Sequence, residues 1–152
     1  MKKISYLKAT KNNLNDLFNL TVEFENYNKD NSTRPKEHFQ KNWEKYFRDE
    51  ILESLKDKSS YIFLAKNDIG YVGYIYSKYC KKCYTYKIEE LFVKPSYRNL
   101  GIADNLIKMA VRIGKKLKME IQVEVFDWNK KAYKYYLKKG FISDSLILKL
   151  PK

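Results

Sequence analysis

The stretch from Glu89 to Leu106 constrains the fold more than any other part of this chain of 152 residues. It begins as a strand pattern, meets Pro95, and continues as a helix pattern after Gly101 and Ala103. Because these two residues have little or no side chain, a ligand can approach the backbone where the first helical turn leaves N–H groups unpaired. Such a turn is suited to binding phosphate groups. The sequence therefore predicts a strand, an anion-binding turn and a helix, with Arg98 adding positive charge at the rim.

The two commonest phosphate-binding motifs are absent from the chain. Neither Gly-x-x-x-x-Gly-Lys-Ser/Thr nor Gly-x-Gly-x-x-Gly occurs in it. A nucleotide triphosphatase and a dinucleotide-dependent dehydrogenase are therefore disfavoured. A turn with one glycine can also be a plain strand-to-helix connection, and these residues alone leave that reading open.

The rest of the chain alternates between strand and helix patterns. Strands are expected at residues 4–9, 61–66, 71–79, 84–93, 121–126 and 141–150. Helices are expected after Thr10, from Pro35 to Leu55, from Ala103 to Lys118, and from Asn129 to Gly140. The strands between 61 and 93 read as an antiparallel meander with hairpin turns at 67–70 and 80–83. The helix that precedes strand 121–126 predicts parallel pairing of that strand with 84–93, as a buried neighbour.

Size and composition place the chain among folded proteins of one domain, residues 1–152. Hydrophobic residues make up 44% of it, which excludes a disordered chain. The N-terminal residues do not resemble a signal peptide, and no apolar run approaches about 18 residues. We therefore expect a cytoplasmic protein with no membrane partner.

The formal net charge of +13 invites comparison with nucleic-acid-binding proteins. However, Arg34, Arg48, Arg98 and Arg112 are the only arginines among 31 basic residues, and the lysines are scattered rather than clustered. Lysine is the poorer residue for bidentate recognition of phosphates and bases. Nucleic acid is therefore not expected as the main partner, and part of the positive field would attract an anionic cofactor.

Cys80 and Cys83 are the only cysteines and stand at a predicted hairpin tip. A closed zinc site needs four ligands, and His38 is the only histidine, so no metal site is expected. We expect two reduced thiols, with a disulfide as the lesser alternative.

Two blocks of the sequence resemble the acetyl-CoA site of the GNAT N-acetyltransferases. The first is Glu-Glu-Leu-Phe-Val-Lys-Pro followed by Tyr-Arg-Asn-Leu-Gly-Ile-Ala, which matches the family pattern Arg/Gln-x-x-Gly-x-Gly/Ala. The second is similar to the family segment that closes the cofactor site and contains, in order, Trp128, Asn129, Ala132, Tyr136, Gly140 and Phe141. The resemblance is clear from about Ile88 to Phe141. It implies an α/β fold with a mixed, mostly antiparallel sheet, about four flanking helices, and central strands splayed apart at the cofactor loop.

The resemblance also implies which residues contact acetyl-CoA, or coenzyme A as the product. They are Leu91, Phe92, Val93, Arg98, Asn99, Leu100, Gly101, Ile102, Ala103, Asp104, Asn129, Ala132 and Tyr136. In the family, the pantetheine arm pairs like an added strand with the edge at Leu91 and Val93. A backbone N–H there can donate to the thioester carbonyl.

Acetyl transfer to an amine needs a neutral nitrogen, a stabilised oxyanion and a proton for the leaving thiolate. Tyr136 matches the family tyrosine beside the thioester sulfur, and a phenol can supply that proton. Glu89 is preferred as the base over Glu90, because period-two counting places Glu89 on the face of Leu91 and Val93. A β-bulge would reverse this choice. Substrate contacts are expected from Glu89, Glu90, Glu25 and Trp128.

Within the family, these blocks are most similar to the diamine and polyamine acetyltransferases. The resemblance thus implies direct acetyl transfer to a primary amine of a small molecule in a ternary complex. Acetylation of a protein N-terminus or lysine, and a non-catalytic acyl-CoA-binding module, stay open as alternatives. A protein of charge +13 repels a polycation at long range, so a polyamine acceptor requires a locally acidic groove. The oligomeric state is open, with a homodimer as one option.

Overall fold

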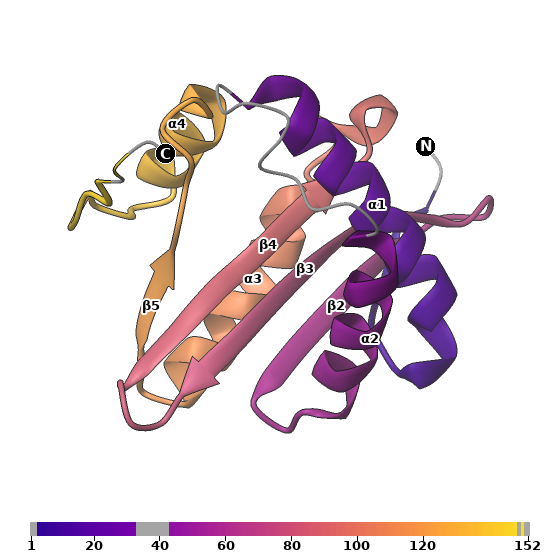
Figure 1. Ribbon diagram of the computed structural model, residues 1–152, viewed down its shortest axis with the longest axis horizontal. Coiled ribbons are helices and arrows are strands. Elements are labelled where there is room, and N and C mark those ends of the chain that lie inside the picture. The colour runs from indigo at the N-terminus through magenta and orange to yellow at the C-terminus, as the bar shows by residue number, and fades with distance from the viewer. Residues whose placement is uncertain (1–2, 33–42, 149, 151–152) are drawn as a thin grey trace.

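A five-stranded sheet with helices on both faces forms the framework of the described residues, which are 3–32, 43–148 and 150 of this computed structural model (Figure 1). The strands are β1 (Ser5–Lys8), β2 (Ser60–Lys66), β3 (Tyr71–Cys80), β4 (Thr85–Val93) and β5 (Glu120–Val123). The α-helices are α1 (Leu14–Asn31), α2 (Trp43–Lys56), α3 (Ile102–Lys116) and α4 (Lys130–Lys138). This arrangement confirms the predicted mixed α/β fold.

The strands lie side by side in the order in which they occur along the chain. Strands β1 to β4 pair antiparallel, and β4 pairs parallel with β5. The parallel pair is joined by α3, as the strand–helix–strand order predicted. The predicted hairpin turn at 67–70 is also present, because the Asn67 side-chain oxygen accepts the backbone N–H of Gly70 at 3.0 Å.

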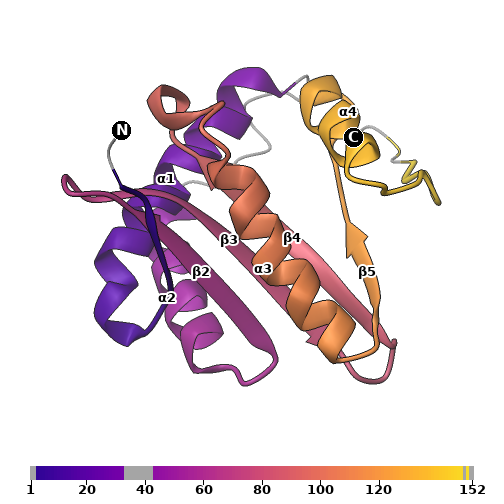
Figure 2. The ribbon, with the colours of Figure 1, turned by 180° about the vertical axis from the view of Figure 1, so that it is seen from behind.

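Two hydrophobic cores lie on opposite faces of the sheet. Helix α3 covers one face and buries Ile102, Leu106 and Ala110, which follow each other at helical spacing (Figure 2). Helices α1 and α2 cover the other face, where Leu17 and Tyr74 are almost completely buried. Each buried large apolar side chain contributes roughly 1.5–3 kcal/mol. The two cores hold the sheet rigidly between the helices.

The sheet opens between β4 and β5. Their parallel pairing runs from Thr85–Glu120 to Ile88–Val123 and then stops, whereas β4 continues to Val93. Figure 1 shows the two strands diverging toward α4. The predicted splay of the central strands is thus confirmed, and in the described chain no strand pairs with the β5-facing edge of β4 beyond Ile88.

Three expectations about the chain's elements were wrong or lie outside the described residues. The final strand at 141–150 is absent, since 141–148 and 150 have no regular secondary structure and Leu146 is 87% exposed. An apolar alternating pattern forms a strand only where a sheet edge pairs with it, which sequence cannot show. Strand β5 ends at Val123 rather than 126 and is a partly exposed edge strand instead of a buried one. The expected start of the second helix at Pro35 lies outside the described residues.

Cys80 and Cys83 are joined by a disulfide at the β3–β4 turn, which corrects the expectation of two reduced thiols. The hairpin brings their Cα atoms to 5.2 Å, within the usual range for a disulfide. Among the described residues, none of the helices has the length and apolar character needed to cross a membrane.

Candidate active site

The turn between β4 and α3 has the geometry of an anion-binding loop. After the short 3-10 helix η3 (Pro95–Tyr97), Asn99 and Gly101 take the left-handed backbone conformation, with φ of 63° and 73°. Helix α3 then begins at Ile102, so the N–H groups of its first turn have no acceptor within the helix. A Cβ placed on Gly101 would meet nothing within 4 Å, so the backbone there is open to a ligand. The strand, turn and helix expected from the sequence are present.

Arg98 holds this turn against the sheet and the α1 helix. Its Nε donates to the Val93 carbonyl at 3.0 Å, and its guanidinium lies 4.8 Å from the ring centroid of Tyr27. A cation over an aromatic face is held electrostatically by the ring. The Arg98 side chain is therefore engaged by the sheet and by α1. Its role at the rim of the turn stays a prediction.

Several residues expected to contact the cofactor are placed so that their side chains face elsewhere. Phe92, Val93 and Ile102 are 4%, 8% and 1% exposed, because their side chains fill the two cores. These residues can offer a ligand only main-chain atoms. Asp104 is engaged by α4, since its carboxylate accepts the Tyr135 hydroxyl at 2.6 Å and pairs with Lys139 at 2.8 Å. The open residues of the turn are Asn99, Leu100 and Gly101.

A cavity of about 300 Å³ lies where β4 and β5 diverge. Its walls come from α1, β4, the end of β5 with the chain that follows it, and α4. Eight of the residues predicted for the site line it: Glu25, Glu89, Glu90, Leu91, Trp128, Asn129, Ala132 and Tyr136. Segments distant in sequence are thus brought together at one place, whereas residues 98–104, which have the geometry of an anion-binding loop, form a separate turn.

The cavity is acidic in an otherwise basic protein. Glu124 joins Glu25, Glu89 and Glu90 in its lining, and among the described residues that line it there is no lysine or arginine. Burial raises the pKa of Glu90 to about 7, partly offset by a hydrogen bond from the Tyr74 hydroxyl at 2.5 Å. Burial also raises the pKa of Glu25, and a hydrogen bond with the Asn28 side chain partly offsets this rise. The cavity favours a cation, which would relieve both carboxylates.

A β-bulge at Glu89 takes this residue off the sheet face of Leu91, whereas Glu90 lies on the face of Phe92, as period-two counting gave. Glu90 pairs with Tyr76 and Ile88 pairs with Ser77, so Glu89 is the additional residue on β4. Glu89 forms an ion pair with Lys87 at 3.3 Å rather than following Leu91 onto the α3 side of the sheet. Period-two counting was therefore wrong for Glu89, because a bulge adds one residue to one strand. Both glutamates line the cavity, and Glu90 is the more buried.

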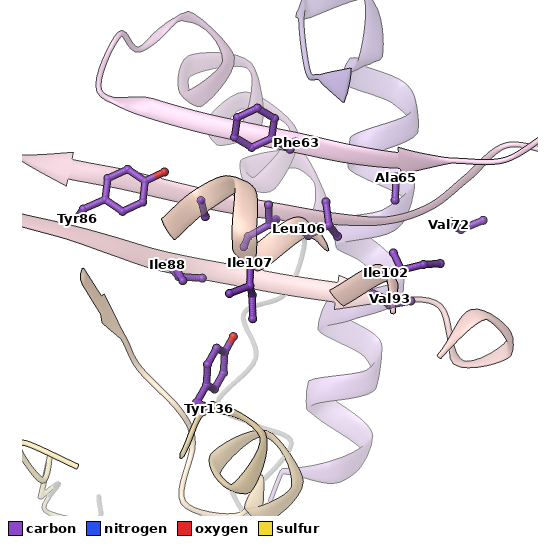
Figure 3. Packing of buried hydrophobic residues seen from close by; sticks show 12 residues of the cluster. Phe63, Ala65, Val72, Tyr86, Ile88, Val93, Ile102, Leu106, Ile107 and Tyr136 are labelled. Carbon is purple, nitrogen blue, oxygen red and sulfur yellow. The ribbon is translucent and has the colours of Figure 1, made fainter. Parts of the chain in front are cut away.

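Tyr136 enters the cavity from α4. The helix begins after Asn129, whose side-chain oxygen accepts the Ala132 N–H at 3.0 Å and caps it as predicted. Tyr136 is 7% exposed, and Figure 3 shows its hydroxyl directed toward Ile107 of α3. Burial raises the pKa of the phenol well above its ordinary value of 10. Tyr136 therefore keeps its proton at neutral pH.

Sequence reasoning missed part of the cavity wall. Phe126 and Trp128 stack at 5.8 Å between ring centroids, and Tyr27 lies 6.5 Å from Trp128, so aromatic rings connect the cavity to Arg98. Asn28 also lines the cavity, one helical turn after Phe24. The spacing of Phe24 and Asn28 on one helix face could have suggested them. No sequence signal distinguishes Tyr74, the partner of Glu90, from the other tyrosines.

Comparison with known proteins finds similar sequences and similar folds. A bovine (Bos taurus) thialysine N-epsilon-acetyltransferase is 33% identical over 73 residues, which span 47% of this chain and 43%, less than half, of that protein. The PaiA N-acetyltransferase of Thermoplasma acidophilum, solved with coenzyme A, has a TM-score of 0.81 at 21% identity, over 95% of this chain and 93% of that one. The aminoglycoside N-acetyltransferase AAC(6')-Iy, solved with CoA, has a TM-score of 0.78 at 19% identity, over 100% of this chain and 96% of that one. The model of the acetyltransferase (GNAT) family matches residues 23–141, most of the chain, and the protein therefore belongs to this family.

Proposed function

We propose that this protein transfers an acetyl group from acetyl-CoA to a primary amine of a small cationic molecule, by direct attack in a ternary complex. The observation that carries the proposal is the cavity beside Tyr136, which four glutamates line in a protein of net charge +13. A field of that sign repels a cation at long range, so a local acidic cavity provides the attraction that such a substrate needs.

The binding surfaces fit acetyl-CoA. The open backbone at Gly101 and the first turn of α3 suit the diphosphate, with Arg98 at the rim. The edge of β4 from Glu89 to Val93 has unpaired main-chain groups on its β5 side, which suit an extended arm with amides. That edge leads from the turn to the cavity. The thioester supplies an activated acetyl group, and the protein residues manage the protons.

Glu90 is the residue best placed to accept a proton from the substrate ammonium. A pKa of about 7 lies much closer to that of an alkyl ammonium than an ordinary carboxylate does, so proton transfer costs less. Glu25 would hold the charge of a second ammonium group, together with Glu89, whose carboxylate also pairs with Lys87 at 3.3 Å. We therefore propose Glu90 as the base and assign Glu89 to substrate binding.

Tyr136 would donate its proton to the departing thiolate. The amine nitrogen forms its bond to the carbonyl carbon, the carbon–sulfur bond breaks, and the phenol proton moves to sulfur. The phenol carries its proton at neutral pH, and because burial raises its pKa and makes it a weaker acid, the proton moves only as the carbon–sulfur bond breaks. Between ammonium and amide the nitrogen loses two protons, which Glu90 passes to solvent, and the Tyr136 phenolate regains one proton from solvent. A main-chain N–H on the open β4 edge, near Leu91, would stabilise the oxyanion.

The test is thiol release from acetyl-CoA with a panel of acceptors: short diamines, aminoglycosides, free lysine analogues and peptides with free N-termini. We expect turnover with small diamines, and a loss of about 100-fold or more in kcat/KM for Glu90→Gln. Preference for peptides would instead favour a protein acetyltransferase. Tight binding of acetyl-CoA with no turnover on any acceptor would indicate a non-catalytic acyl-CoA-binding module and refute the proposal.

A further inference from the structure

Asp104 connects the anion-binding turn to the helix that carries Tyr136. It is the third residue of α3, in the turn whose N–H groups face outward. Both of its carboxylate oxygens are engaged by α4 and its C-cap: Oδ1 accepts the hydroxyl of Tyr135 at 2.6 Å, and Oδ2 lies 2.8 Å from Nζ of the C-cap residue Lys139. Lys139 in turn lies 5.4 Å from the ring centroid of Tyr135. We call Asp104, Tyr135 and Lys139 the α3–α4 clamp.

The clamp acts next to the proposed acid. Tyr135 and Tyr136 are adjacent on α4, and their rings meet edge to face at 5.5 Å. In Figures 1 and 2, α4 lies beyond the open end of the sheet, and the chain between β5 and α4 forms no strand. The helix therefore depends on side-chain contacts, more than on sheet pairing, for its position. Charge-assisted hydrogen bonds are stronger than neutral ones, and the bond from the Tyr135 hydroxyl to Asp104 is partly buried, whereas the ion pair with Lys139 is about one-third exposed.

We propose that the α3–α4 clamp is a positioning device that fixes the Tyr136 hydroxyl relative to the anion-binding turn. This inference rests on the function proposed above. The diphosphate end and the thiol end of the cofactor are held by α3 and α4 respectively, so their relative placement decides whether the phenol reaches sulfur. A displacement of about 1 Å can cost about 100-fold in rate.

The clamp also explains how a carboxylate is tolerated beside a phosphate-binding turn. Hydrogen bonding from Lys139, then from Tyr135, lowers the pKa of Asp104, so this carboxylate is ionised at neutral pH. An ionised Asp104 alone would repel a diphosphate, and Lys139 neutralises it. The two members of the ion pair should therefore affect cofactor affinity in opposite directions when they are removed singly. If Asp104 instead bound the cofactor directly, removing either residue would weaken coenzyme A binding.

The experiment compares Asp104→Asn, Tyr135→Phe and Lys139→Met with Lys138→Met, which removes a charge from the same helix at an exposed position. Three quantities are measured for each variant. Calorimetry gives the affinity for coenzyme A, amide hydrogen exchange of α4 is followed without cofactor, and kcat and KM are determined with the best acceptor. We expect Lys139→Met to weaken coenzyme A about 3-fold or more, and Asp104→Asn to leave it unchanged or tighter. All three clamp variants should lower kcat about 10-fold and speed α4 exchange about 10-fold, whereas Lys138→Met should do neither.

Equal weakening of coenzyme A in Asp104→Asn and Lys139→Met would overturn the proposal and make Asp104 a cofactor ligand. Exchange and kcat no different from Lys138→Met would also overturn it. If the wild-type protein acetylates no amine, the proposed function fails, but the exchange and affinity measurements still decide whether the clamp exists. Tyr135→Phe, which removes one hydroxyl and no charge, guards against a general loss of folding.

Discussion

Replacing Glu90 by glutamine should change how the stability of the protein depends on pH. The pKa of Glu90 is raised from 4.5 to about 7, chiefly because burial penalises the charged carboxylate. The folded chain therefore holds this proton up to higher pH than the unfolded chain. The contribution of protonated Glu90 to the stability of the folded state is therefore fully present below pH 4.5, and it is lost as pH rises through about 7.

The size of the effect follows from the two pKa values. With 4.5 in the unfolded state and about 7 in the folded state, this one group lowers the unfolding free energy by about 2.5 kcal/mol between pH 5 and pH 8. Glutamine cannot ionise and still accepts the Tyr74 hydroxyl hydrogen bond. Relative to wild type, Glu90→Gln should therefore become more stable by that amount at pH 8 than at pH 5.

The assay is urea unfolding of wild type, Glu90→Gln and Glu89→Gln at both pH values. Glu89→Gln is the matched control, because it removes a neighbouring, more exposed carboxylate and keeps Glu90. The contributions of carboxylates that do not interact with Glu90 or Glu89 cancel in the difference between wild type and each variant, and Glu89→Gln reports the size of the coupling between these two neighbours. A pH-independent difference for Glu90→Gln, or the same shift in Glu89→Gln, would refute the argument that Glu90 is a buried group with its pKa near neutrality.

The remaining predictions concern the turn, the acid and the core. Tyr136→Phe should lower kcat by about 100-fold or more with unchanged coenzyme A affinity in calorimetry, and unchanged turnover would remove Tyr136 from its role as acid. Gly101→Val forces a branched residue into φ of 73°, which costs about 1–2 kcal/mol, and should abolish coenzyme A binding; normal binding would show that the turn is misassigned. Gly114→Ala places a Cβ 2.7 Å from Cγ1 of Ile121. The free energy of unfolding, measured with urea, should therefore fall by about 1–3 kcal/mol. An unchanged value would mean that β5 shifts to accept the methyl group without cost.

Much of the fold could be predicted from the periodicity of apolar residues and from residues typical of turns and helix caps. The stripe of α3, the turn at Asn67 and the cap at Asn129 are local signals, and each is present in the structure. The pattern at 141–150 misled, because strand formation depends on a partner edge elsewhere in the chain. The disulfide between Cys80 and Cys83 also depends on the hairpin geometry, and composition alone favoured reduced thiols.

For the candidate site, sequence motifs selected individual candidate residues, and the structure showed how these residues lie relative to one another. Motif spacing identified Gly101, Asn129 and Tyr136, because each sits where backbone geometry or a helix cap restricts the residue type. The engagement of Asp104 by α4 was not foreseeable, since it joins residues about 30 positions apart through side chains.

The sequence by itself determined the strand, turn and helix around Gly101, since these depend on contacts between near neighbours in the chain. Tertiary structure decided which glutamate is buried, because the bulge at Glu89 and the hydroxyl of Tyr74 belong to a strand pair. It also decided that acidic side chains from α1, β4 and the chain after β5 share one cavity. Burial and pairing across strands are properties of the packed molecule, and they set the charge state on which the proposed chemistry depends.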